Sequence, residues 1–263
     1  MTIRQGFLVE WPADLETALG VAVEHGFDYV ELNMDYAFER ERVNPESVRR
    51  AAQERTVDLL VHLPYRLASA SPHAHVREGA NRELEVAIDA AVEMGARKGV
   101  FHAVSLAHPE KWDAREMRER ICESVRRVDD YANDRGFTAC VENLKTPFFD
   151  AGDFPDLFER TDAVGCLDTG HAHVTGQTMD EQADLLRDWG DRISHIHVND
   201  TRRDDEDEHL PVGLGKLDFG VLADAIRETD WTGTCTHEVE TFDYEYAAYG
   251  RDRFDRLLGA SER

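Results

Sequence analysis

Short apolar segments alternate with amphipathic helical patterns along the whole chain, and this alternation limits the fold more than any other feature. Each apolar segment is of strand length, and each helical pattern is long enough to cross back over a sheet. Eight strands are expected, at residues 3–9, 29–32, 57–63, 98–102, 138–142, 163–167, 193–198 and 234–238. Strands that alternate regularly with helices pair in parallel sheets.

The expected helices carry local signals for where helices begin and end. Asn44-Pro45-Glu46 provides an N-cap, a proline and an acidic residue at one helix start, and Gly26 ends another helix. Helices are expected at residues 13–25, 44–55, 75–94, 114–134, 155–160, 179–189, 218–228 and 244–258. Eight strand–helix units predict an α/β fold, a closed parallel eight-stranded (β/α)8 TIM barrel with outer helices, as a single domain over residues 1–263. The alternative is an open doubly wound sheet, but no glycine-rich phosphate loop follows the first strand.

The composition is strongly acidic. Asp and Glu number 54 against 30 Lys and Arg, which gives a formal net charge of −24. Nearly all of the basic residues are arginine. An excess of acids with few lysines along the whole chain is typical of a halophilic protein from a high-salt cytoplasm. The resulting field opposes binding to a polyanion such as nucleic acid unless a local basic surface exists.

The cysteines indicate the compartment. Cys122, Cys140, Cys166 and Cys235 form no CxxC pair, and three of them lie in or beside apolar segments. Buried free thiols in a reducing compartment are therefore expected, rather than disulfides or a zinc knuckle. No segment resembles a signal peptide or reaches the length of a membrane span. We therefore expect a soluble cytoplasmic protein.

Six consecutive expected strands end in side chains that can bind a metal. These residues, from the third to the eighth strand, are His62, His102, Glu142, Asp168, His197 and Glu238. A barrel brings the carboxyl ends of its strands to one face, where the active sites of this fold lie. One polar strand end has no special meaning, but this set contains only His, Asp and Glu, the nitrogen and oxygen ligands of zinc, manganese and magnesium. The sequence therefore predicts a metal site at that face.

Two further segments add candidate ligands. His171 follows Asp168 by three residues, so both side chains can reach the mouth of the barrel. Asp207 and His209 follow the seventh strand and precede Gly213-Leu214-Gly215. These glycines either let the backbone approach a bound group or form a tight turn into the next helix.

With these motifs the sequence resembles the xylose isomerase-like barrel superfamily, which also contains the endonuclease IV (AP endonuclease family 2) proteins. The resemblance runs from Val30-Glu31-Leu32-Asn33 to His237-Glu238-Val239-Glu240 and so covers nearly the whole chain. Its most specific motifs are Val141-Glu142-Asn143, Leu167-Asp168-Thr169-Gly170-His171, His197-Val198-Asn199-Asp200 and the segment 209–215.

The resemblance divides the candidate ligands into two sets. The first corresponds to the four-ligand metal site of the sugar isomerases and epimerases and comprises Glu142, Asp168, His197 and Glu238. The second matches the additional ligands of the trinuclear zinc cluster of endonuclease IV and comprises His62, His102, His171, Asp207 and His209. Glu240 is the alternative to Glu238. The implied cofactor is one to three divalent ions of manganese, zinc, magnesium or cobalt.

The leading hypothesis is a sugar or sugar-phosphate isomerase or epimerase. A divalent ion would chelate a carbonyl oxygen and its neighbouring hydroxyl and acidify the hydrogen on the carbon between them. Glu142 and Glu238 would remove and return that proton, and His171 would orient the substrate. The candidate substrate-binding residues, all basic and close to the site motifs, are Lys145, Arg202 and Lys216.

The alternative is cleavage of a phosphodiester at abasic DNA, as in endonuclease IV. Nine candidate ligands suit three metals better than one. Against this, residues 6–11 lack the histidine of the first-strand motif of endonuclease IV, residues 34–42 lack its DNA-reading pattern, and the loop around Asp207 is acidic. A small-molecule sugar or sugar phosphate is therefore a more expected partner than nucleic acid. A third possibility, a non-catalytic metal-binding barrel, gives no reason for two carboxylates around an open cavity.

Overall fold

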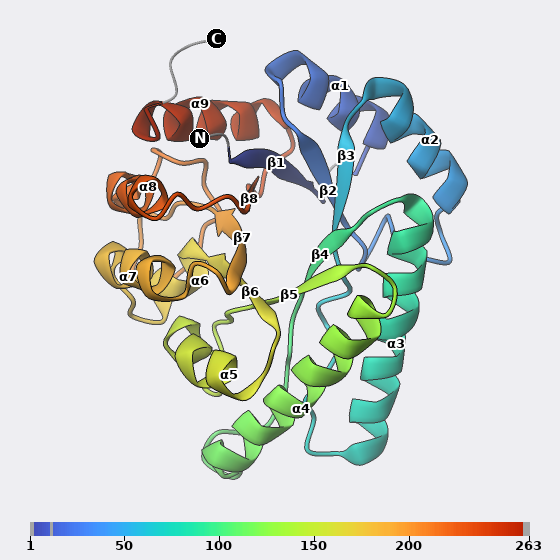
Figure 1. The fold of residues 1–263 in the computed structure, drawn as a ribbon, viewed down its shortest axis with the longest axis vertical. Helices are drawn as coiled ribbons and strands as arrows, with labels where there is room; N and C mark the ends of the chain where they lie inside the picture. Colours follow the sequence, from blue (N-terminus) through green and yellow to red (C-terminus); the bar gives the residue numbers. More distant parts are fainter. Residues whose placement is uncertain (1–2, 11–12, 260–263) are drawn as a thin grey trace.

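In the computed structural model, which describes residues 3–10 and 13–259, eight parallel strands close into a barrel (Figure 1). Each strand pairs with its neighbours in sequence, and β1 pairs with β8 to close the sheet. The strands are β1 (Arg4–Val9), β2 (Tyr29–Asn33), β3 (Asp58–His62), β4 (Lys98–Phe101), β5 (Thr138–Glu142), β6 (Val164–Asp168), β7 (Ile193–Val198) and β8 (Thr234–His237). The predicted TIM barrel is confirmed. Trp11, at the end of the expected first-strand motif, lies outside the described residues.

Helices surround the barrel on its outer side (Figure 1). They are α1 (Leu15–His25), α2 (Pro45–Arg55), α3 (Ala74–Met94), α4 (Ala114–Asn133), α5 (Phe154–Arg160), α6 (Thr169–Val174), α7 (Met179–Trp189), α8 (Phe219–Glu228) and α9 (Glu245–Leu257), with a 3-10 turn η1 (Ala151–Asp153) before α5. None of the described helices is long and apolar enough to cross a bilayer.

Helix ends follow the signals in the sequence. The Asn44 side chain accepts a hydrogen bond from the amide of Ser47 at the start of α2, and Gly26 ends α1 with φ +69°. The short helix α6, which directly follows β6, was not predicted. The Asp168 side chain caps it by accepting the amide hydrogen of His171.

The inside of the barrel differs from the core beneath the helices. Because successive strand residues point to opposite faces, alternate side chains enter the barrel. Most apolar strand residues pack outward into one large core. Inside, Val100, Cys140 and Cys166 form a separate small cluster. Glu142 and Asp168 lie two residues further along β5 and β6, so they point inward at the carboxyl end. All four cysteines are buried and free of disulfides, as predicted.

Candidate metal centre

The barrel brings all nine predicted ligands together at the carboxyl ends of the strands. His62, Glu142 and Asp168 end β3, β5 and β6, and His197 is the last residue but one of β7. His102 and Glu238 directly follow β4 and β8. The three remaining residues, His171 on α6 and Asp207 and His209 on the loop after β7, reach the same place from the next segments.

The nine side chains form three groups, in each of which the donor atoms lie within 4.8 Å of one another. The inner group is His62, His102 and Glu142; the central group is Glu142, Asp168, His197 and Glu238; the outer group is His171, Asp207 and His209. Glu142 belongs to two groups. Each group contains imidazole nitrogens and at least one carboxylate, the mixture that zinc and manganese bind.

Glu142 joins the groups through its two oxygens. Its Oε2 lies 2.8 Å from His102 Nε2 and 3.3 Å from His62 Nε2 in the inner group. Its Oε1 lies 3.1 Å from His171 Nδ1 and 3.6 Å from His197 Nδ1. Glu142 could therefore contribute a ligand oxygen to both the inner and the central group.

The central and outer groups are also in contact. Glu238 Oε2 lies 3.1 Å from His197 Nδ1 in the central group and 3.6 Å from His209 Nε2 in the outer group. His171 Nε2 and His209 Nε2 each lie 3.5 Å from Asp207 Oδ2. The three groups therefore form one continuous cluster rather than three separate sites.

Several donor atoms in this cluster are buried without a hydrogen-bond partner among the described residues. They are Glu142 Oε1, His197 Nδ1, Asp207 Oδ1 and Glu238 Oε2. Buried polar atoms in folded proteins are nearly always satisfied. Three of these atoms, Glu142 Oε1, His197 Nδ1 and Glu238 Oε2, face other ligand-type side chains of the cluster, an arrangement that fits bound cations.

The charge balance points the same way. Burial lowers the pKa of His62, but its hydrogen bond with Glu142 outweighs burial and raises that pKa to about 8. Burial also lowers the pKa of His171, but the Asp168 and Glu142 carboxylates outweigh burial and raise that pKa to about 9. In the same way, Glu238 outweighs burial and raises the pKa of His209 to about 10. Without a bound cation, protons on these imidazoles balance the negative charge of the carboxylates. Divalent ions would balance the same negative charge.

Asp168 is fixed by its neighbours rather than by the strand alone. Its Oδ1 accepts the His171 amide, and its Oδ2 accepts the Asn199 side-chain amide at 2.7 Å. Asn143 exchanges hydrogen bonds with the Asp168 backbone. Burial raises the pKa of Asp168 to about 7. A Cβ atom at Gly170 would lie 2.0 Å from Asn199 Oδ1, so only glycine permits this packing.

The outer group depends on the loop between β7 and α8. Asp200 is buried, and its carboxylate accepts the amides of Gly213 and Gly215 at 2.9 and 2.8 Å. The glycines thus form a tight turn around Asp200, one of the two roles expected for them. His209 has φ +45°, a conformation that few non-glycine residues adopt, and its side chain belongs to the outer group.

The predicted substrate-binding residues lie at the rim. Lys145 Nζ is 3.2 Å from Asp207 Oδ2, next to the outer group. Arg202 pairs with Glu208 and Lys216 pairs with Asp204, both within the acidic loop. Glu240, the alternative ligand, is largely exposed, with its Oε1 3.9 Å from His209 Nδ1.

Sequence reasoning gave no role to two buried residues that support the ligands, Asp200 and Glu31. Glu31, on β2, is fully buried, and its Oε1 lies 3.2 Å from His197 Nε2. Burial raises the pKa of Glu31, but the charge of His197 and hydrogen bonds from His195 and His197 outweigh burial and lower it. The signal was an acidic residue within an apolar strand, Tyr29-Val30-Glu31-Leu32.

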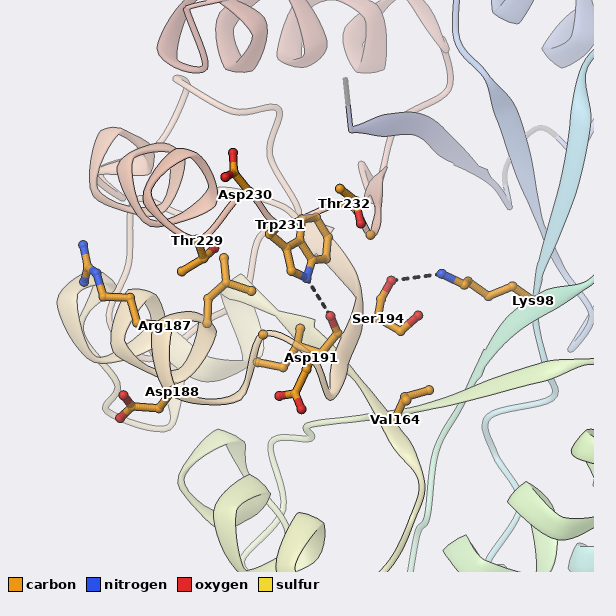
Figure 2. Close-up of a pocket in the computed structure, with 14 residues that line it drawn as sticks. Lys98, Val164, Arg187, Asp188, Asp191, Ser194, Thr229, Asp230, Trp231 and Thr232 are labelled. Atoms are coloured by element: carbon orange, nitrogen blue, oxygen red, sulfur yellow. Dashed lines mark hydrogen bonds between the residues drawn. The ribbon is translucent and has the colours of Figure 1, made fainter. Parts of the chain in front are cut away.

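A hollow of about 590 Å³ opens at the opposite end of the barrel (Figure 2). Its lining includes Lys98, Val164 and Ile193, the first residues of β4, β6 and β7. Lys98 donates to the backbone oxygen of Ser194 there. In barrels of this type the amino-terminal end contributes to stability, and the chemistry lies at the carboxyl end.

Comparisons with known proteins agree with this architecture. A family described as "Xylose isomerase-like TIM barrel" matches residues 19–257. An uncharacterised protein of Methanocaldococcus jannaschii is 25% identical over 241 residues, 88% of this chain and 81% of its own. A "Probable endonuclease 4" of Mycobacterium tuberculosis (strain CDC 1551 / Oshkosh) is 25% identical over 215 residues, 80% of this chain and 84% of its own.

Solved structures share the fold at lower identity. A D-tagatose 3-epimerase-like protein has a TM-score of 0.82 and 20% identity, covering 98% of this chain and 97% of its own. The D-psicose 3-epimerase of Clostridium cellulolyticum H10, solved with D-tagatose, has a TM-score of 0.78 and 17% identity, covering 97% of this chain and 99% of its own.

Proposed function

The chain belongs to the xylose isomerase-like TIM-barrel family, and on that premise we propose that it is a divalent-metal-dependent phosphodiesterase of the endonuclease IV type, acting at abasic sites in DNA. One observation carries the proposal: nine ligand-type side chains form three contiguous groups joined through Glu142. An isomerase needs only the central group. The curated relatives called "Probable endonuclease 4" favour the same reading.

The charge of the site supports a phosphate substrate. The three groups contain four carboxylates, Glu142, Asp168, Asp207 and Glu238, and five histidines. Three divalent ions would supply six positive charges against these four negative charges, leaving an excess of two that favours an anion. A single ion in the central group would face three carboxylates and leave a net negative site.

When bound, clustered divalent ions polarise a phosphoryl oxygen and stabilise the attacking and leaving oxygens of a displacement together. An ion in the inner group would be held by His62 and His102, whose Nε2 atoms face Glu142. The Nδ1–H of His62 donates to the Leu63 carbonyl, which leaves Nε2 as the free ligand nitrogen. His171 is arranged in the same way, with Nδ1 at 3.0 Å from the Asn143 carbonyl and Nε2 facing Asp207.

The rim supplies positioning groups for the substrate. Lys145 extends from the loop after β5 and is partly exposed beside the outer group, where it can donate to a phosphate oxygen. Both oxygens of Glu142 face imidazoles, so in a phosphodiesterase this carboxylate would help to hold the ions rather than accept a proton. Burial of the cluster excludes bulk water and strengthens each electrostatic contact.

The test combines metal analysis with two assays. Protein purified in molar salt is analysed for bound metal and then given a duplex oligonucleotide with a single abasic site, and separately a ketose. We expect three ions per chain and strand cleavage that depends on the abasic site, decreasing as salt rises because phosphate contacts release counterions. An intact duplex without the abasic site is the substrate control.

Single variants identify which groups are needed. His102→Asn removes a ligand of the inner group and His209→Asn one of the outer group, whereas His75→Asn changes an exposed histidine on α3. We expect the first two variants to lose cleavage by about 100-fold or more and the third to match the wild type. One ion per chain, with cleavage absent, would refute the proposal.

The central group alone supports a second candidate, a sugar or sugar-phosphate isomerase or epimerase. Glu142 and Glu238 both belong to this group, so one ion there would have two carboxylates beside its substrate. In this case His171 would orient the substrate. Ketose conversion that survives His102→Asn but is lost in Glu238→Gln would establish this candidate over the phosphodiesterase.

A further inference from the structure

A polar network crosses the inside of the barrel directly beneath the metal centre. Its middle is the carboxylate of Glu31 on β2, which is fully buried. Glu31 Oε1 accepts a hydrogen bond from His197 Nε2 at 3.2 Å, and Glu31 Oε2 accepts one from Thr236 Oγ1 at 2.5 Å. The opposite nitrogen of His197, Nδ1, is the one that faces the central group.

The hydrogen-bond directions in this network can be followed from the far end of the barrel. Lys98 Nζ, in the hollow shown in Figure 2, donates to Thr234 Oγ1 at 3.2 Å. The Thr234 hydroxyl in turn lies 2.6 Å from His195 Nδ1. Because Lys98 has only donors, this hydroxyl is free to donate to Nδ1. The His195 proton then lies on Nε2, 3.2 Å from Glu31 Oε2.

Two hydrogen-bond donors, from β7 and β8, therefore converge on one carboxylate, with His195 Nε2 close by, and the two oxygens serve different partners. Oε2 contacts Thr236 and His195, which are not among the nine ligands. Oε1 contacts His197, which is one of the nine candidate ligands. No basic side chain of Lys or Arg pairs with Glu31 among the ion pairs of the described residues.

We propose that Glu31 is a positioning residue for the metal centre. A neutral imidazole carries one proton, and the nitrogen without it is the metal ligand. By accepting the Nε2–H of His197, Glu31 keeps that proton off Nδ1 and fixes the ring with Nδ1 toward Glu142 and Glu238. Such carboxylate–histidine–metal arrangements orient the ring and make it a stronger ligand. The inference rests on the metal centre of the proposed function but not on which reaction the centre serves.

A purely structural role for Glu31 makes a different prediction, and Thr236 provides the matched control. Thr236→Val has nearly the same shape and removes a hydrogen bond to the same carboxylate without touching His197. If Glu31 only satisfies buried donors, Glu31→Gln and Thr236→Val should act alike. If it orients His197, only Glu31→Gln should weaken metal binding.

The experiment titrates Zn²⁺ alone, in competition with a chelator, into the metal-free full-length wild type and each variant in molar salt. Thermal unfolding is recorded in parallel. We expect Glu31→Gln to weaken binding at the central group by about 10- to 100-fold, and Thr236→Val to bind zinc as the wild type does. Glu31→Asp, which withdraws the carboxylate by one methylene, is the second variant and should weaken binding in the same direction.

Three results would overturn the inference: wild-type affinity in Glu31→Gln, equal loss of affinity in Thr236→Val, or a wild-type protein that binds no zinc. The last also refutes the proposed function. In contrast, weakened zinc binding in Glu31→Gln together with no cleavage by the zinc-loaded wild type would support the role of Glu31 and refute only the phosphodiesterase.

Discussion

Replacing Asp200 by Asn is expected to release the loop that carries Asp207 and His209. Asp200 is fully buried, and each of its carboxylate oxygens accepts two backbone amides. The donors are the amides of Thr201, Gly213, Gly215 and Leu217, at 2.8–3.1 Å. The carboxylate thereby ties both ends of the loop between β7 and α8 to the end of β7.

The magnitude follows from counting these bonds. Asparagine keeps one oxygen, and its NH₂ group would face two amide hydrogens that it cannot accept. Two hydrogen bonds to a charged group are lost, each worth about 1.5–3 kcal/mol, so holding the loop becomes about 3–6 kcal/mol less favourable. Domains of this kind are stable by about 5–15 kcal/mol. The loop should therefore open locally while the barrel remains folded.

Two measurements check this expectation. Trypsin should cut Asp200→Asn faster than the wild type at Arg202, Arg203 or Lys216, while far-ultraviolet circular dichroism is unchanged. The outer group should lose its ion, so bound metal falls by one per chain. Asp205→Asn, which changes an exposed acid of the same loop, is the control and should match the wild type. Unchanged cleavage and full metal content in Asp200→Asn would refute the reasoning.

Three further outcomes are expected. Burial lowers the pKa of His237 to about 3, so below pH 6.5 the unfolded chain binds a proton that the folded chain does not. The free energy of unfolding, measured by urea titration, should therefore fall by about 2 kcal/mol on going to pH 5. The fall should be smaller in His237→Gln. Zinc binding should release protons below about pH 9 and weaken as pH falls, because His171 and His209 must be deprotonated, and calorimetry in buffers of different ionisation enthalpy will measure this. Burial raises the pKa of Cys140 to about 11, so its thiol should react with a disulfide reagent only after unfolding, and reaction in the native protein would contradict the buried position.

The positions of the candidate ligands at the strand ends could be predicted because two simple periodicities locate them. Apolar segments alternating with helices predict the barrel, and the barrel places the carboxyl end of every strand on one face. Glu142 and Asp168 come directly after apolar residues at the ends of such segments. Their closeness could therefore be predicted without knowing any contact between side chains. The division into three groups could not, because it depends on which oxygen of Glu142 faces which histidine ring.

The supporting residues could not be predicted in this way. Glu31 and His197 are 166 residues apart, and their contact arises only because β2 and β7 face each other across the barrel. Asp200 follows Asn199 in a motif that looks like a ligand segment, yet its carboxylate binds backbone amides. The helix α6 was missed because six residues give too short a period to recognise. Its formation depends on the Asp168 cap rather than on helix propensity.

The position of Glu31 is difficult to explain by stability. The inside of a barrel of this fold is normally filled by branched apolar side chains, whereas here the buried polar side chains of Glu31, His195, Thr234 and Thr236 lie inside the barrel near the candidate metal centre. Removing charges from water costs several kcal/mol, and well-packed apolar residues often replace a buried ion pair at no loss of stability. A role in stability alone would therefore favour aliphatic residues in this layer. Orientation of His197 requires a hydrogen-bond acceptor at this position, as the Glu31 carboxylate provides, because no apolar side chain can accept the Nε2–H and leave Nδ1 for a metal.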